Sequence, residues 1–144
     1  MPKIFKKIVC PVAFDRASTS AIEFARELAD PLRSTVYLLH VVSASGMEAI
    51  LREPYPIVTE EIASGELGKL AQHHLESKVP HRLVVRRGDP AVEILAVADE
   101  LGADLIVMAT HSGREISRLI FGSVAERVVR EAKQPVLTIR PYHY

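Results

Sequence analysis

Hydrophobic and polar positions along the chain fall into two alternating patterns. Short, continuous apolar runs rich in β-branched residues are typical of strands covered on both faces, and they occupy residues 6–14, 34–42, 81–88, 103–110 and 134–141. Most of the segments between them carry apolar residues at helical spacing. This regular alternation of strand and helix predicts an α/β fold with a parallel sheet.

The predicted helices have recognisable ends. The segment 18–32 places its apolar residues on one helical face, and the helix is expected to end before Pro31 because proline cannot continue it. The helix within residues 89–102 has a capping residue at Asp89, a proline at its first position and a stop signal at Gly102.

The composition of the strands predicts their order in the sheet. The first, second and fourth strands are the most uniformly apolar and belong at its centre. The third strand carries three arginines, and the fifth is short with Pro135 near its start, so both belong at the edges. Right-handed crossovers then give five parallel strands in the order 3-2-1-4-5.

This order reverses the winding of the sheet between the first and fourth strands. Ligands of open α/β sheets bind at the carboxyl ends of the strands where the winding reverses. The sequence therefore predicts a crevice bounded by residues 11–13 on one side and by residues 108–110 on the other.

The connection over residues 43–80 is longer than the others. Its second half keeps helical periodicity in spite of Gly65 and Gly68, whereas residues 43–56 have the composition of an irregular loop. Long loops of this kind are commonly either functional or disordered. Two interpretations stay open, a lid over the crevice and a disordered connection.

Length and charge limit the classes of function. The 144 residues suit one domain spanning 1–144, with a core large enough to need no metal or disulfide for stability. Eighteen basic residues balance eighteen acidic ones, so the overall charge predicts neither nucleic acid nor an anionic membrane as a partner. No apolar run approaches about eighteen residues, the length needed to span a bilayer.

The single cysteine, Cys10, lies in an apolar run and is expected to pack as a small hydrophobic residue. One cysteine cannot form an internal disulfide, which favours a reducing setting. The first apolar stretch is too short for a signal peptide and contains Pro11. The expected localisation is therefore cytoplasmic.

A glycine and a serine open the last predicted helix, over residues 123–132. Backbone N–H groups at a helix start lack internal partners, and the helix dipole adds partial positive charge, so Gly122 and Ser123 form a candidate phosphate site. A second interpretation needs no ligand, because Ser123 and Glu126 have the spacing of a capping box.

Arg114, Arg118 and Arg127 place positive charge near this helix start, which suits a polyphosphate. The alternative is a solvated loop and helix face, since surface arginines need no ligand to explain them. The sequence contains neither a GxxxxGK[ST] phosphate loop nor a GxGxxG dinucleotide motif, which excludes both general nucleotide motifs.

Metal and catalytic chemistry have little support in the sequence. His73 and His74 are adjacent, so on a helix they point about 100° apart and cannot chelate one ion together. The other histidines show no ligand spacing, and no metal site is predicted. His111 lies in the glycine loop without an evident carboxylate to orient it, which favours a solvent-facing residue over a catalytic acid or base.

Several segments resemble the universal stress protein family. The runs KKIVCPVAF, TVYLLHVV and ADLIVMATH resemble the family's first, second and fourth strands, and GDPAVEIL resembles its Gly-x-Pro helix start. The most specific match is SRLIFGSVAERVVREAKQPVLTIRP, at residues 117–141. The resemblance covers essentially the whole chain and implies a three-layer α/β/α domain of the adenine nucleotide alpha hydrolase-like type.

Members of that family that bind ATP carry a G-x2-G-x9-G-[ST] motif around the fourth strand and the last helix. Gly122 and Ser123 match its last two positions, whereas Ala109 and Ser112 stand where the first two glycines are expected. Gly113 comes one residue late, so the glycine loop departs from the family's usual register.

The family's first strand also usually ends in an aspartate that reaches the ribose and metal region of the nucleotide. Ala13 stands at that position, and Asp15 follows two residues later, where capping the first helix is its expected role. Losing one charged hydrogen bond costs about 1.5–3 kcal/mol, or about tenfold to a hundredfold in affinity. The departures therefore predict weakened nucleotide binding.

The resemblance implies a stress-response regulator that binds an adenine nucleotide, ATP with Mg²⁺, as a signal rather than as a substrate. The binding residues that it implies are Pro11, Val12, Ala13, Val41, Met108, Ala109, Ser112, Gly113, Gly122, Ser123 and Val124. The alternative is a family member that binds no nucleotide and acts through protein partners. ATP hydrolysis ranks below both.

The resemblance also implies a homodimer. The exposed edge strand from Pro135 to Arg140 is a template for a second strand, and a two-fold axis pairs it antiparallel with its own copy. The alternative is an edge that proline and charge protect from pairing.

Overall fold

The computed structural model describes residues 4–43, 59–75, 79–110 and 122–140. In these ranges, five parallel strands form one sheet in the order β3-β2-β1-β4-β5, which confirms the predicted order and fold class. The strands are β1 (Lys7–Pro11), β2 (Thr35–Ser43), β3 (His81–Gly88), β4 (Leu105–Ala109) and β5 (Val136–Ile139).

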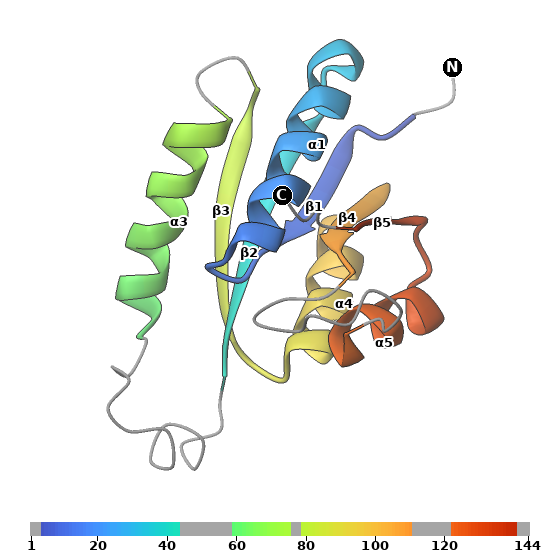
Figure 1. The fold of residues 1–144 in the computed structure, drawn as a ribbon. Helices are drawn as coiled ribbons and strands as arrows, with labels where there is room; N and C mark the ends of the chain where they lie inside the picture. Colours follow the sequence, from blue (N-terminus) through green and yellow to red (C-terminus); the bar gives the residue numbers. More distant parts are fainter. Residues whose placement is uncertain (1–3, 44–58, 76–78, 111–121, 141–144) are drawn as a thin grey trace.

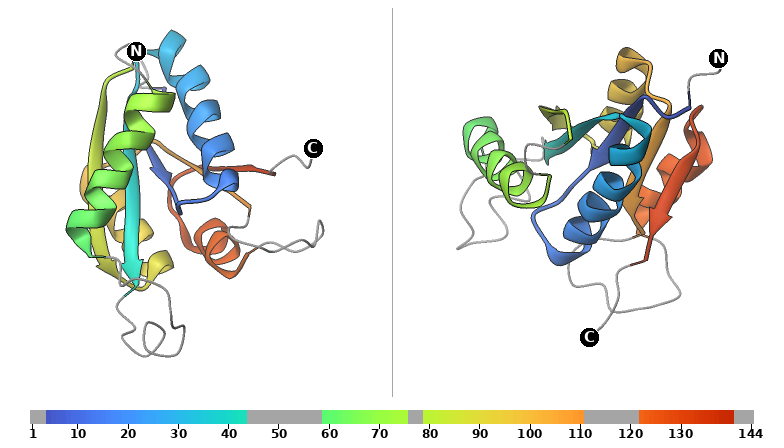
Figure 2. Two further views of the ribbon diagram at one scale, coloured as in Figure 1. Left: turned by 60° about the vertical axis from the view of Figure 1, so that its left-hand side comes forward. Right: turned by 90° about the horizontal axis from the view of Figure 1, so that it is seen from above.

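Helices cover both faces of this sheet (Figure 1). On one face lie α1 (Arg16–Leu32) and α3 (Glu60–His74), and on the other lie α4 (Pro90–Leu101) and α5 (Ser123–Glu131). The two further views show the same three layers, with the sheet between the helix pairs (Figure 2).

The sheet is buried on both faces, which explains the continuous apolar runs in the sequence. Side chains alternate along each strand, so Ile8 and Cys10 of β1 pack with α1 and α3, whereas Val9 packs with α4 and α5. All three side chains are fully buried. The domain therefore has two hydrophobic cores, one on each side of the sheet.

Helix α1 corrects one prediction, because it continues through Pro31 to Leu32. The proline lies in the last turn, where it removes one helical N–H close to the helix end rather than in its middle. The helix then ends at Arg33, which adopts a left-handed conformation with φ of 54°. The N–H of Ser34 closes this end by donating to the carbonyl of Ala29 at 3.0 Å.

Helix α4 confirms the predicted signals at both of its ends. The carboxylate of Asp89 accepts a hydrogen bond from the N–H of Val92 at 3.2 Å, and Pro90 occupies the first helical position. At the other end, Gly102 has a φ of 63°, a conformation that glycine adopts without strain.

Helix α3 confirms the helical periodicity in the long connection. It begins after Thr59, whose hydroxyl oxygen accepts a hydrogen bond from the N–H of Ile62 at 3.2 Å. Residues 44–58 lie outside the described residues, so both interpretations of the 43–56 loop stay predictions. No helix within the described ranges is long and apolar enough to cross a membrane.

Arg87 anchors the two elements that flank residues 44–58. Its guanidinium, on β3, donates hydrogen bonds to the carboxylate of Glu60 at the start of α3 and to the carbonyl of Ser43 at the end of β2, the latter at 3.5 Å. The hydrogen bond from Arg87 holds the pKa of Glu60 below its ordinary value. The end of β2 and the start of α3 are therefore both fixed to β3.

Cys10 is fully buried, which confirms its predicted role as a small hydrophobic residue. Burial raises the pKa of its thiol from 9.0 to about 12, because the thiolate would lose its hydration. Between these two pH values the unfolded chain binds fewer protons than the folded chain. The free energy of unfolding should therefore fall with rising pH, by about 1.4 kcal/mol per pH unit from this group.

We expect Cys10→Ala to lose this component of the pH dependence above pH 9.0, as measured by urea unfolding at a series of pH values. The native wild-type protein should also resist a thiol reagent at neutral pH and react after unfolding. Equal labelling rates in the folded and unfolded states would contradict the buried thiol.

Candidate functional site

The sheet opens between β1 and β4 at its carboxyl end. Along this edge, β1 pairs with β4 through Ile8 and Val9. The N–H of Val12 donates to the carbonyl of Leu39 on β2 at 2.8 Å. Backbone N–H directions alternate along a strand, so the nitrogen of the preceding residue, Pro11, faces β4 on the opposite side of β1. Because proline has no N–H, it cannot extend the ladder to β4, and the pairing of these two strands stops.

A cavity of about 650 Å³ lies at this opening. Nine of the eleven residues predicted to bind a ligand line it together: Pro11, Val12, Ala13, Val41, Met108, Ala109, Gly122, Ser123 and Val124. The other two, Ser112 and Gly113, lie outside the described residues. The structure thus brings β1, β2, β4 and α5 to one crevice, and its use for a ligand stays a prediction.

The cavity is also lined by residues that were not predicted to bind a ligand: Ser18, Leu39, His40, Pro90, Ile94, Ala125 and Glu126. Pro90 and Ile94 come from the first turns of α4, which packs beside α5. Their helical spacing was visible in the sequence, but the orientation of α4 toward the crevice was not. Ser18 and His40 bring polar side chains to the cavity wall.

The start of α5 faces this cavity without a side-chain cap. Gly122 is the capping position, and no side chain in the described part of the chain hydrogen-bonds to this end. The first helical hydrogen bond runs from the N–H of Glu126 to the carbonyl of Gly122 at 2.9 Å. The N–H groups of Ser123, Val124 and Ala125 therefore have no acceptor within the helix.

This geometry corrects the capping-box interpretation. Ser123 is the first residue of the helix rather than its cap, so its hydroxyl is not placed to bond the third N–H of the turn. The carboxylate of Glu126 accepts a hydrogen bond from Arg130 at 2.8 Å instead of turning back to the helix start. No described residue caps this end of the helix, and the helix dipole there favours an anion.

The loop between β1 and α1 forms another part of the cavity wall. The carboxylate of Asp15 caps α1 by accepting a hydrogen bond from the N–H of Ser18 at 2.9 Å, which confirms its predicted role. The hydroxyl oxygen of Ser18 in turn accepts a hydrogen bond from the N–H of Ala13 at 2.7 Å. The backbone at Ala13 is therefore held in place, while its side chain offers the cavity only a methyl group.

His40 supports the end of β1 from the neighbouring strand. Its Nδ1 lies 2.8 Å from the carbonyl oxygen of Val12, and its ring stacks on Phe14 with the ring centroids 4.2 Å apart. In the sequence, His40 shows no metal-ligand spacing and no local pattern that indicates this supporting contact. Its neighbour Val41 is one of the predicted binding residues. The contact between His40 and Val12 depends on the pairing of β1 with β2, which is not visible in the local sequence.

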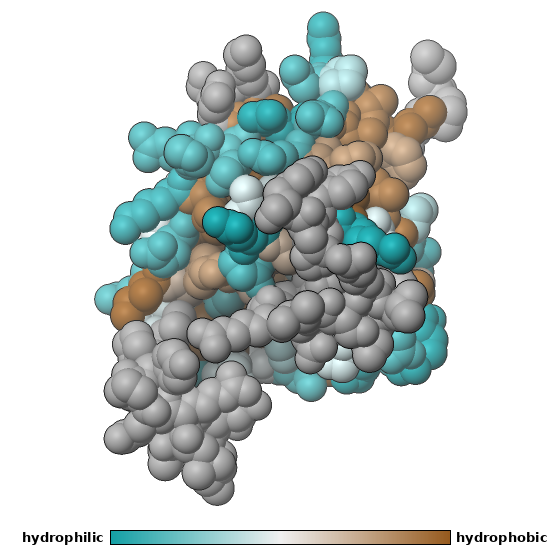
Figure 3. Space-filling view, in the orientation of Figure 1, coloured by the Kyte–Doolittle hydropathy of each residue, from teal (hydrophilic) through white to brown (hydrophobic). Residues whose placement is uncertain are grey.

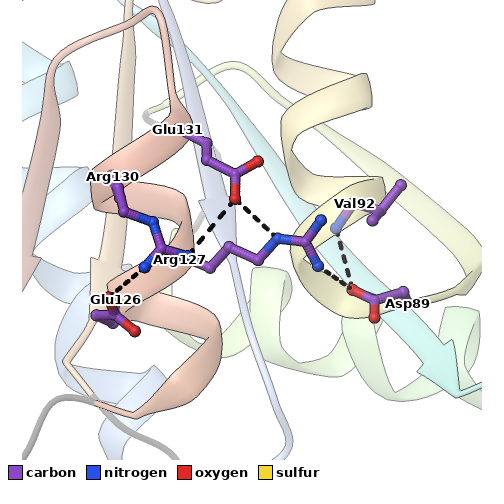
Figure 4. A network of polar contacts seen from close by, with 6 residues as sticks. All are labelled: Asp89, Val92, Glu126, Arg127, Arg130 and Glu131. Atoms are coloured by element: carbon purple, nitrogen blue, oxygen red, sulfur yellow. Dashed lines mark hydrogen bonds and ion pairs between the residues drawn. The ribbon is translucent and has the colours of Figure 1, made fainter.

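Arg127 does not contribute its charge to the cavity, contrary to the sequence-based expectation. Its guanidinium contacts the carboxylate of Glu131 at 3.0 Å and that of Asp89 at 3.6 Å (Figure 4). Since Asp89 also caps α4, this arginine links the start of α4 to α5. Arg114 and Arg118 lie outside the described residues, as does His111.

The crevice combines an apolar part with one end suited to an anion. Val12, Val41 and Met108 supply apolar surface, and the open N–H groups of α5 supply hydrogen-bond donors. In the described ranges, no group of three or more His, Cys, Asp or Glu residues is placed to hold a metal ion. The arrangement suits a ligand with a flat apolar moiety and a negatively charged group.

The fold and the crevice together define an open, doubly wound α/β protein with its candidate site where the winding reverses. The model of the universal stress protein family matches residues 4–140, and the chain belongs to that family. A relative, universal stress protein MJ0531 of Methanocaldococcus jannaschii, is 33% identical over 141 residues, which cover 95% of this chain and 83% of that protein.

Solved structures of the same family share the fold. Universal stress protein UspA from Lactobacillus plantarum matches with a TM-score of 0.81 at 22% identity, over 96% of this chain and 100% of that chain. A universal stress protein from Archaeoglobus fulgidus, solved in complex with dAMP, matches with a TM-score of 0.65 at 26% identity, over 96% of this chain and 99% of that chain. These similarities confirm the predicted family and the α/β/α architecture.

Proposed function

We propose that this protein binds an adenine nucleotide of the ATP type in the crevice between β1 and β4, as a signal rather than as a substrate. The observation that carries the proposal is the open start of α5, whose N–H groups face a cavity with apolar walls. The dAMP complex of the Archaeoglobus fulgidus relative supports an adenine nucleotide as the ligand class.

The chemistry of the cavity wall suggests how such a ligand would lie. The base would pack among Val12, Val41 and Met108, where the surface is apolar. The phosphate nearest the protein would accept hydrogen bonds from the first N–H groups of α5, at Ser123 and Val124. The nucleotide would then contact β2 on one side of the opening and β4 and α5 on the other.

Magnesium fits the described cavity wall poorly as a protein-bound ion. Mg²⁺ prefers carboxylate and other oxygen ligands. The carboxylate among the described wall residues, Glu126, is paired with Arg130, and Ala13 stands where the family usually has aspartate. A magnesium ion would therefore arrive on the nucleotide, held by phosphate oxygens and water.

Equilibrium dialysis with ATP, with and without Mg²⁺, tests the proposal directly. We expect saturable binding in the micromolar to millimolar range, with a small effect of Mg²⁺, because the one carboxylate among the described wall residues, Glu126, is paired with Arg130. Mass spectrometry of small molecules released from the purified protein would identify a ligand that stays bound. Absence of binding at millimolar ATP under both conditions removes the proposal.

A second candidate function is partner binding without a nucleotide. Ala13 and Ala109, at positions where nucleotide-binding relatives are expected to carry aspartate and glycine, favour it. In that case a bulky residue at Gly122 would leave partner binding intact. Retained partner binding in a protein that fails to bind ATP would distinguish this function from the first.

We also propose that β5 pairs with its copy in a homodimer. β5 is an edge strand, and the carbonyls of Pro135 and Ile139 accept hydrogen bonds from the N–H groups of Ile106 on β4 and of Thr110 directly after it. Because backbone groups alternate in direction, those of Thr138 face outward from the sheet. Hydrophobic surface is also visible on the side where β1, β4 and β5 lie (Figure 3).

Thr138→Pro is expected to shift the protein from dimer to monomer, because it removes an outward N–H without removing a bond to β4. Size-exclusion chromatography with light scattering would measure the mass. Thr138→Val, which keeps the N–H, is the matched control and should remain dimeric. A wild-type monomer, or a Thr138→Pro dimer, would contradict pairing through β5.

A further inference from the structure

The edge strand β5 offers a second copy of the chain only a short template. It has four residues, of which Val136 and Thr138 turn their backbone groups away from β4, since the carbonyl of Ile139 faces β4. Two residues provide only a few hydrogen bonds, whereas a stable interface buries about 1,200–2,000 Å² in total. A dimer through this edge therefore needs further surface next to β5.

On one face of the sheet, α5 supplies such a surface. This helix packs against α4 and β5, and its Arg127 turns toward α4, where its guanidinium lies 3.6 Å from the carboxylate of Asp89 (Figure 4). Val129 follows two residues later, about 160° around the helix from Arg127, with the buried Ala125 and Val128 between them on the side of the sheet. Val129 is 46% exposed and therefore lies on the flank of α5 that is turned away from α4.

On the other face of the sheet, α1 has the same arrangement. Its Arg26 turns toward α3 and donates to the carbonyl of His74 at 3.0 Å. Phe24 lies about 160° around the helix from Arg26, so it is on the flank turned away from α3, and it is 39% exposed. Leu28, one turn further along the same flank, is partly buried. Since α1 also packs on β4 and β5, this flank lies toward the β5 edge.

The side chains of β5 connect these two flanks through the edge of the sheet. Leu137 and Ile139 are partly buried against the core under α1, and Val136 is partly buried against the core under α5. Exposed apolar side chains that occur singly need no explanation, but these adjoin one edge strand on both of its faces. Beside Val129, the ion pair of Glu126 with Arg130 gives the apolar flank the polar border that is typical of an interface.

We propose that a second copy of this chain covers the outer flanks of α1 and α5, so that Phe24 and Val129 join β5 in one self-complementary interface. The inference rests on the proposed pairing of β5. Antiparallel pairing within one continuous sheet requires a two-fold axis perpendicular to the sheet, which keeps each face on its own side. The α5 flank therefore meets the α5 flank of the copy, and the α1 flank meets that of α1.

The test measures the dimer dissociation constant of Val129→Lys by sedimentation velocity over a series of protein concentrations. We expect it to rise by about tenfold or more, because the two-fold axis brings the introduced charge toward its own copy. Val92→Lys is the matched control, since Val92 is 43% exposed on α4, which packs over β1, β2 and β3. This control should dimerise as the wild type does.

A mixing experiment separates loss of the interface from loss of the fold. Val129→Lys and Val129→Glu should each dimerise weakly alone, but an equimolar mixture should form heterodimers, which native mass spectrometry resolves by mass. Mixing cannot repair a misfolded chain.

The α1 flank has its own pair of variants. Phe24→Ser should raise the dissociation constant by about fivefold or more, because it removes an aromatic side chain from the interface. Ile62→Ser, at a 50% exposed residue of α3, should leave it unchanged, because α3 packs over β2 and β3.

Two kinds of result would overturn the inference in different ways. If Thr138→Pro dissociates while Val129→Lys or Phe24→Ser dimerises as tightly as its control, β5 pairing stands and the flanks are not part of the interface. Failure of the Val129 mixture to form heterodimers would likewise exclude contact between the α5 flanks. A monomeric wild type would remove β5 pairing and this inference together.

Discussion

Gly122→Leu is expected to lower the affinity for ATP by about a hundredfold or more. Gly122 precedes the open N–H groups of α5 and lines the cavity, so a leucine side chain there would compete with the phosphate for the same space. Each lost hydrogen bond to a charged group costs about 1.5–3 kcal/mol, and two such bonds account for the expected loss.

The backbone conformation at Gly122 lets this variant test steric access to the site without disturbing the fold. Its φ of −63° and ψ of 151° are open to any residue, so leucine introduces no backbone strain. Calorimetric titration with ATP would measure the affinity, and thermal unfolding would confirm that the domain remains folded.

Gly65→Leu is the matched control for this variant. It makes the same chemical change in α3, where an added Cβ would meet no atom within 4 Å. This variant should bind ATP as the wild type does. Unchanged affinity in Gly122→Leu would show that the ligand does not approach the start of α5, and the proposed phosphate position would be wrong.

Ile106→Ala should produce the largest loss of stability among single substitutions considered for this chain. Ile106 is fully buried on β4, where it pairs with Val9 of β1 and Val136 of β5. Removing a buried isoleucine side chain to the β-carbon costs about 2–5 kcal/mol, because transfer energy is lost and a cavity remains. Urea unfolding should show a lower midpoint with an unchanged slope.

The control is Ile62→Ala, which makes the same substitution on the outer face of α3. The Ile62 residue is 50% exposed, so little apolar surface returns to water, and the expected change is within about 0.5 kcal/mol. Similar losses in the two variants would contradict the burial pattern described for β4.

The fold was predictable because its determinants are local or follow from composition. Asp89, Pro90 and Gly102 specify the ends of α4 by their own backbone and capping chemistry. The arginines of β3 exclude it from the centre of the sheet, and that exclusion fixes most of the strand order. The prediction that α1 ends before Pro31 was wrong, because the free-energy cost of a proline in a helix depends on its distance from the helix end.

The crevice was less predictable because side-chain partners come from distant elements. The sequence predicted Arg127 near a phosphate. Its guanidinium instead forms ion pairs with Glu131 and with Asp89, which lies 38 positions earlier in the chain. His40 meets Val12 through the pairing of β1 with β2, which no local pattern encodes. The role of the backbone at Gly122 could be predicted from the sequence, because the first N–H groups of any helix lack partners within the helix.

The proline in β1 has a consequence for the rate of ligand entry. Because Pro11 lacks the donor that would join β1 to β4, the strands need not be separated before a molecule enters. Stopped-flow traces should therefore show a single phase whose observed rate rises linearly with ligand concentration. A plateau at high concentration would instead reveal a slow opening step that precedes the encounter.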